Sequence, residues 1–132
     1  MTSYATAKRP AEKAASAHRH GAGVWIKERV SSLVLVPLTG WGFWAASTLT
    51  GGGFDGARRW LQSPVNAALL GLLILVSAYH MRLGLRVVIE DYVHKPFGKG
   101  FLLFLNTLFC LAVAVIALAS ILMIALTGGA GA

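Results

Sequence analysis

Three long apolar stretches dominate the sequence, at residues 30–49, 64–89 and 101–126. Each contains about 20 or more mostly apolar residues, which is the length an α-helix needs to cross the hydrocarbon core of a bilayer. Because 56% of the 132 residues are hydrophobic and the mean hydropathy is +0.66, these stretches are more than the core of a soluble domain requires. The sequence therefore predicts an all-α integral membrane protein, with three transmembrane helices in one membrane domain, residues 24–126.

The segments outside these stretches are expected to be short and irregular. Residues 1–23 lack apolar periodicity and predict a flexible cytoplasmic tail, and residues 127–132 predict a C-terminal tail. The glycines of residues 50–56 predict a loop between the first two spans, and residues 96–100 predict a short turn before the third. The first tail lacks the apolar core of a secretory signal peptide, and its basic, acid-poor composition only faintly resembles a mitochondrial presequence.

Positive charges predict the orientation of the spans. With three spans, most of the 12 Lys and Arg residues fall on one side of the membrane, namely those before residue 31 and those from 82 to 99. Arg58 and Arg59 fall on the other side. The positive-inside rule then makes the N-terminus cytoplasmic, in a bacterial inner membrane or, less favoured, facing the matrix from a mitochondrial one. The net charge of +7 therefore reports topology, and no interleaved basic and aromatic strip predicts a nucleic-acid partner.

The end of the second span carries the most concentrated chemistry. His80 lies well inside the span, and an ionisable residue at membrane depth is a candidate for function. At about 100° per residue, Gly84 and Asp91 share the face of His80, together with two valines, and Asp91 lies roughly 16 Å further along the helix, near the membrane surface. Two interpretations remain open. His80 is either a neutral histidine bonded to a neighbouring helix or the ligand of a flat cofactor, for which Gly84 leaves room.

Polar residues also mark the start of the first span, at Arg29, Ser31 and Ser32. The arginine can extend to lipid headgroups while the serines bond backbone carbonyls, or the three can line a site at the membrane surface. The predicted orientation puts this group on the same side as Asp91 and Tyr92. The two groups are therefore able to converge.

The remaining polar and small residues are expected to have structural roles. The third span contains no charge, and its small residues provide surfaces for close helix packing: Ala112, Ala114, Ala117, Ala119 and Ser120. Cys110 is expected to be a small packing residue, since a single cysteine cannot form an internal disulfide. His94 is expected to be solvated or to lie at an interface.

These patterns together resemble the hydrophobic membrane-anchor proteins of succinate dehydrogenase. The resemblance rests on His80, followed after ten residues by Asp91-Tyr92, and on the sequence WIKERVSS at residues 25–32. It also rests on the order of three spans with the N-terminus inside. It covers about residues 24–126.

The resemblance implies a set of partners. In this family the hydrophobic anchor pairs with a second three-span anchor, the cytochrome b subunit. The two together hold a flavoprotein subunit, which oxidises succinate, and an iron–sulfur subunit on the membrane. The assembly is respiratory complex II, which joins the tricarboxylic acid cycle to electron transport. The chain would then be part of an enzyme while carrying no succinate chemistry itself.

The resemblance also implies cofactors and site residues. A haem b lies between the two anchors, with one histidine ligand from each, and His80 matches the iron ligand of the hydrophobic anchor. Tyr92 matches the tyrosine that hydrogen-bonds ubiquinone, and Asp91 matches the carboxylate that supports the quinone site. Arg29 matches an arginine in the vicinity of the quinone or a haem propionate. Arg82 stands where the family often has histidine or glycine, and it can reach a propionate or extend to headgroups.

Chemical reasoning from the residues agrees with these roles. Quinone reduction takes up two electrons and two protons, and a phenol hydroxyl can hold a quinone oxygen and pass a proton to it. We therefore expect an anchor subunit of succinate:ubiquinone oxidoreductase that supplies a haem ligand and part of the quinone site. Two alternatives are the anchor of a related fumarate reductase, working with menaquinone, and a non-catalytic small membrane protein such as a transporter subunit or assembly factor.

Overall fold

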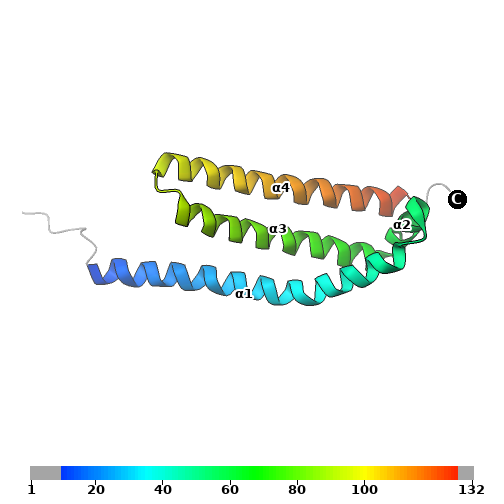
Figure 1. Ribbon diagram of the computed structural model, residues 1–132, viewed down its shortest axis with the longest axis horizontal. Coiled ribbons are helices and arrows are strands. Elements are labelled where there is room, and N and C mark those ends of the chain that lie inside the picture. The colour runs from blue at the N-terminus through cyan, green and yellow to red at the C-terminus, as the bar shows by residue number, and fades with distance from the viewer. Residues whose placement is uncertain (1–9, 128–132) are drawn as a thin grey trace, which may run out of the picture.

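The computed structural model describes residues 10–127, with side chains from residue 21 onward, and within this range it contains four helices and no strand. The helices are α1 (Pro10–Leu49), α2 (Gly53–Leu61), α3 (Pro64–Tyr92) and α4 (Pro96–Thr127) (Figure 1). Three segments are long and apolar enough to cross a membrane: Gly21–Leu49, Pro64–Tyr92 and Pro96–Thr127. The predicted all-α fold with three spans is confirmed.

The three long helices form a row with α3 in the middle (Figure 1). α3 packs against α1 on one side and α4 on the other, while α1 and α4 do not pack against each other in the described range. The start of α1 and the connection between α3 and α4 lie at one end of the row, and α2 lies at the other. A row of three helices has two open faces, so most of its apolar side chains remain exposed.

Each seam of the row is a line of buried and mostly small side chains. On α1 the line is Ser31, Leu38 and Ala45, spaced seven residues apart. On α4 it is Asn106, Cys110 and Ala114, spaced four apart. Both spacings keep residues on one helical face, and small side chains let membrane helices approach closely. The packing role expected for Cys110 and Ala114 agrees with this, whereas Ala112, Ala119 and Ser120 face away from the seam.

The first helix begins earlier than the sequence predicted. α1 starts at Pro10, so the second half of the predicted flexible tail, residues 10–23, is helical. Proline is favoured in the first turn of a helix, and the residues that follow are rich in the strong helix formers Ala, Glu and Lys. The absence of an apolar face there did not prevent a helix, because this part of α1 continues the first span. Residues 1–9 and 128–132 of the predicted tails lie outside the described range.

A short helix replaces most of the predicted glycine loop. Only residues 50–52 form a turn before α2, and Gly53 has a positive φ of 58°, which glycine adopts without strain. Asp55 in the first turn and Arg58 and Arg59 in the last turn of α2 complement its dipole. The ring of Trp60 stacks on Trp41 of α1 with centroids 5.7 Å apart. The glycines therefore mark the entrance to a helix that an aromatic pair holds against α1.

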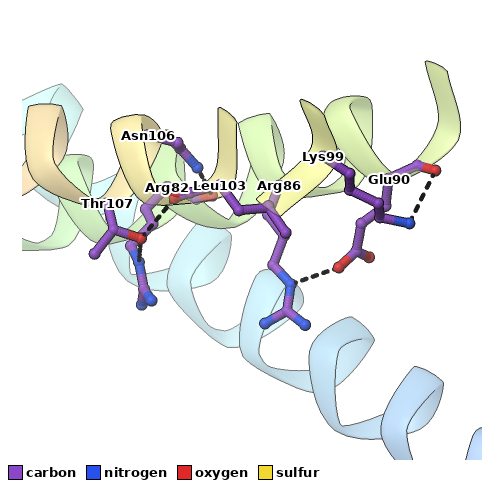
Figure 2. Close-up of polar contacts among 7 residues, drawn as sticks. All are labelled: Arg82, Arg86, Glu90, Lys99, Leu103, Asn106 and Thr107. Carbon is purple, nitrogen blue, oxygen red and sulfur yellow. Dashed lines mark hydrogen bonds and ion pairs between the residues drawn. The ribbon is translucent and has the colours of Figure 1, made fainter. Parts of the chain in front are cut away.

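The connection between α3 and α4 is also shorter than predicted. It consists of residues 93–95, and α4 begins directly at Pro96, so the glycines at 98 and 100 belong to its first turns. Lys99 in that first turn donates from Nζ to the carbonyl oxygen of Glu90 in the last turn of α3, at 3.5 Å (Figure 2). A cation is favourable at the C-terminus of a helix. This contact joins the first turn of α4 to the last turn of α3, next to Asp91 and Tyr92.

Candidate functional site

His80 is bonded to the neighbouring helix. Its Nδ1 lies 2.9 Å from Oγ of Ser31, which belongs to the buried line of α1. Ser31 is only 6% exposed, whereas His80 is half-buried. Leu38 is buried on the face of α1 that packs against α3. Ser31 lies seven residues before it, so it falls on the same face and reaches α3 as well. The contact uses only one of the two ring nitrogens, so it is compatible with both interpretations of His80 made from the sequence.

Ser31 and Ser32 also bond the backbone of their own helix. Oγ of Ser31 donates to the carbonyl oxygen of Glu28 at 2.9 Å, and Oγ of Ser32 donates to the same oxygen at 2.7 Å. This is the backbone-bonding role that the sequence offered as one alternative. Ser31 differs from Ser32 because its hydroxyl has a second partner, the His80 ring.

Open space lies near His80, at Gly84 and beside Tyr79. A Cβ placed on Gly84, one turn further along α3, would meet no atom within 4 Å. A groove of about 340 Å³ between α1 and α3 is lined by Ser31 and Tyr79, among other residues. A second groove of about 320 Å³, between α3 and α4, is lined by Tyr79 and Arg82. A side chain at Gly84 would therefore meet no other described residue, and the two grooves lie beside Tyr79, the residue before His80.

Asp91 and Tyr92 lie at the far end of α3. Tyr92 is the last residue of the helix and is 80% exposed, and Asp91 is exposed as well. At about 1.5 Å per residue, Tyr92 is roughly 18 Å along the helix from His80. The pair thus forms an open surface element, which a partner chain would have to cover to make a pocket.

The polar group at the start of α1 does not converge with Asp91 and Tyr92. Because α1 and α3 are antiparallel and Ser31 meets His80, Arg29 lies only about 3 Å along the axis from that contact. Its guanidinium group lies 5.2 Å from the ring centre of Trp25, a cation–π contact. The chain therefore has two groups of polar residues at different depths along the helices. One group is His80 with Ser31 and Arg29, and the other is Asp91 with Tyr92 at the end of α3.

A polar cluster in the seam between α3 and α4 was missed by the sequence analysis. Nε of Arg82 donates to Oγ1 of Thr107 at 3.2 Å, and Nδ2 of Asn106 donates to the backbone oxygen of Arg82 at 3.0 Å (Figure 2). Oδ1 of Asn106 accepts from the thiol of Cys110 at 3.5 Å. The third span thus has a polar role as well as packing. The Asn-Thr pair inside an otherwise apolar run was the signal that could have revealed it.

The fold and this site define a class of protein: a small all-α membrane protein with three spans and a bonded histidine inside the second. The family of succinate dehydrogenase/fumarate reductase transmembrane subunits matches residues 2–127. Because the match covers nearly the whole chain, the protein belongs to this family. Its place in the complex is that of a membrane anchor, as the resemblance predicted, which argues against a transporter subunit or an assembly factor.

Curated relatives support the same assignment. The chain is 30% identical to the succinate dehydrogenase hydrophobic membrane anchor subunit of Rickettsia typhi, over 75% of this chain and 79% of the relative. It is 30% identical to the protein of that name from Rickettsia conorii, over 74% and 78%. No solved structure matches the chain significantly.

Proposed function

We propose that the chain is the membrane anchor of a succinate:ubiquinone oxidoreductase, where it supplies one axial ligand of haem b and part of the ubiquinone site. The observation that carries the proposal is His80, bonded through Nδ1 to Ser31, with Gly84 leaving open space beside it in the second span. Family membership makes a flavoprotein, an iron–sulfur protein and a second anchor the expected partners. The chain itself would carry no succinate chemistry.

His80 has the properties that a haem ligand requires. Iron-binding histidines generally use one ring nitrogen for the metal and the other for a hydrogen bond that orients the ring, and Ser31 provides that bond here. The described residues contain no group of three His, Cys, Asp or Glu side chains that could hold a bare metal ion. A single histidine suits a metal whose other ligands come from a porphyrin and a second chain. A haem held there would supply a one-electron redox centre.

Replacing His80 tests the haem proposal. We expect the complex purified with His80→Ala to lose the b-type haem absorption bands, while the complex with His94→Ala keeps them. His94 is the matched control because it is exposed in the connection between α3 and α4. Full haem content in the His80→Ala complex would refute the ligand role.

Tyr92 and Asp91 are proposed to form this chain's share of the quinone site. The phenol hydroxyl of Tyr92 would donate its one proton to a quinone carbonyl oxygen, and the carboxyl group of Asp91, when protonated, would support the site by returning a proton to the phenolate. The exposure of both side chains at the end of α3 fits a site that other subunits complete. Arg29 lies at the same depth as His80, so we assign it to the vicinity of a haem propionate rather than to the quinone.

Removing the phenol hydroxyl tests the quinone role. We expect Tyr92→Phe to lower succinate–ubiquinone turnover by about a hundred- to ten-thousand-fold, the range typical of a lost acid–base group, while succinate oxidation by a soluble dye continues. Tyr79→Phe removes a tyrosine hydroxyl roughly 20 Å away along α3 and should leave both activities unchanged. Equal turnover with both acceptors in the Tyr92→Phe complex would contradict the role.

Orientation and quinone type complete the proposal. The positive-inside rule favours a cytoplasmic N-terminus in a bacterial inner membrane, because Lys and Arg gather at the N-terminal end and at the α3–α4 connection. Tyr92 would then face the side on which succinate is oxidised.

The family description includes fumarate reductase as well, so a fumarate reductase anchor with menaquinone is the second candidate. Extraction of the quinone that co-purifies with the complex separates the two.

A further inference from the structure

The hydrogen bond between Ser31 and His80 has a direction that determines which ring nitrogen is free. The Ser31 hydroxyl has one proton and two acceptors within reach, the carbonyl oxygen of Glu28 and Nδ1 of His80, both at 2.9 Å. If the proton goes to Glu28, Ser31 must accept from a protonated Nδ1, which leaves a lone pair on Nε2. If the proton goes to Nδ1, then Nε2 carries the ring hydrogen.

The surroundings distinguish these two arrangements. With Nδ1 protonated, Nδ1–H donates to Oγ of Ser31, and the Ser31 hydroxyl donates to the carbonyl oxygen of Glu28. Both hydrogens then have an acceptor, and only the lone pair of Nε2 has no partner. With Nε2 protonated, its N–H would need an acceptor inside the second span, and the hydrogen bond that the structure gives the His80 side chain uses Nδ1 alone. An N–H group without an acceptor in lipid costs several kcal/mol. The first arrangement is therefore favoured, and it leaves the nitrogen that a metal can take.

We infer that Ser31 is a positioning residue that selects the Nδ1-protonated form of His80 and fixes the plane of its ring. The inference rests on the proposed haem role of His80. A hydrogen bond accepted from Nδ1–H raises the electron density of the ring, which makes Nε2 a stronger donor and favours ferric iron. Ser31 is suited to this role because it is buried in the α1–α3 seam and bonded to its own helix.

Paired serine variants test the inference in the assembled complex. Ser31→Ala removes the acceptor, and Ser32→Ala is the matched control, since Ser32 bonds the same carbonyl oxygen but not His80. We expect Ser31→Ala to weaken haem binding by about ten- to a hundred-fold, the usual effect of losing such a partner. We also expect a more positive haem reduction potential and a shifted low-spin ferric EPR signal. Ser32→Ala should match the unaltered complex in all three measurements.

Two further variants separate a hydrogen-bond effect from a folding effect. Ser31→Thr keeps the hydroxyl and should restore the potential and the EPR signal. Ser31→Cys fills the same space with a weak acceptor and should give intermediate values, which provides a result even if the alanine variant assembles poorly.

The inference is overturned if Ser31→Ala and Ser32→Ala complexes bind haem with the same affinity, potential and EPR signal. It is also overturned if Ser31→Thr behaves like Ser31→Ala. Failure of the underlying proposal looks different, because haem would then be absent from the unaltered complex or retained in full by His80→Ala.

Discussion

His80 illustrates what a sequence reveals about a single residue and what it does not. Its depth in the second span follows from counting apolar residues, and that depth made it a candidate. Its partner did not follow, because the contact depends on the register of α1 against α3. The sequence groups Ser31 with Asp91 and Tyr92 at the membrane surface, whereas the structure pairs it with His80. A bond from His80 to a neighbouring helix was one of the two predicted interpretations, but the residue that makes this bond was not predicted.

Gly42 controls how closely α1 approaches α3. A Cβ at this position would lie 3.0 Å from Cδ2 of Leu73 on α3. A larger side chain therefore has to displace the end of the Leu73 side chain, and overpacking of this kind typically costs about 1–3 kcal/mol of stability. We expect Gly42→Leu to lower the thermal unfolding midpoint of the detergent-solubilised complex.

Gly40 provides the control for this prediction. It lies in the same helix, and a Cβ there meets no atom within 4 Å. Gly40→Leu should leave the unfolding midpoint of the complex unchanged or raise it slightly, since leucine is the better helix former. If the two leucine variants unfold at the same temperature, Gly42 does not set the spacing of the helices.

At the scale of elements, the three spans were predicted because hydropathy and length alone define them. The ends of the helices were predicted less well. The glycines at residues 50–56 and 98–100 suggested loops. In the first region only residues 50–52 are non-helical, and near the second the non-helical residues are 93–95, before the glycines. Glycine is a weak signal when tertiary contacts, such as the Trp41–Trp60 stack, hold the segment in a helix. The polar seam at Asn106 was not predicted, because the third span contains no charged residue to mark it.

Asn106 is predicted to join α4 to α3. Its side chain is buried, and its Nδ2 donates to the backbone oxygen of Arg82 at 3.0 Å. Interhelical hydrogen bonds in membranes average about 0.6 kcal/mol and reach about 1.7 kcal/mol. We expect Asn106→Leu, which roughly keeps the side-chain size, to destabilise the complex by an amount in this range, measured by denaturation in mixed micelles.

Ser120 in the same helix is the matched control. It is exposed and bonds only the carbonyl oxygen of Ile116 in its own helix. Ser120→Ala should therefore have no measurable effect on stability. A loss as large in Ser120→Ala as in Asn106→Leu would show that the α3–α4 hydrogen bond contributes nothing specific.

The whole molecule is a row rather than a bundle, and this explains why the candidate site is incomplete. α1 and α4 do not pack together in the described range, so both faces of α3 retain open space. The open groove beside Ser31 and the exposed Tyr92 lie on helices whose other contacts must come from lipid or another chain. The sequence predicted the three spans but not this arrangement, because hydropathy does not report which helices touch.

The topology of this row yields a prediction about sidedness. α2 lies at one end of the row, and the α3–α4 connection and Tyr92 lie at the other (Figure 1). Asp55 and Lys95 are exposed at these two ends, and the single native cysteine, Cys110, is buried. We expect a membrane-impermeant thiol reagent to label Asp55→Cys in intact bacterial spheroplasts, because the positive-inside rule puts α2 on the outer side. Lys95→Cys should react only after detergent opens the membrane, and the unaltered chain should react in neither case. The reverse pattern would put Tyr92 on the outer face, away from the side on which the proposed partners oxidise succinate, and would exclude it from the quinone site.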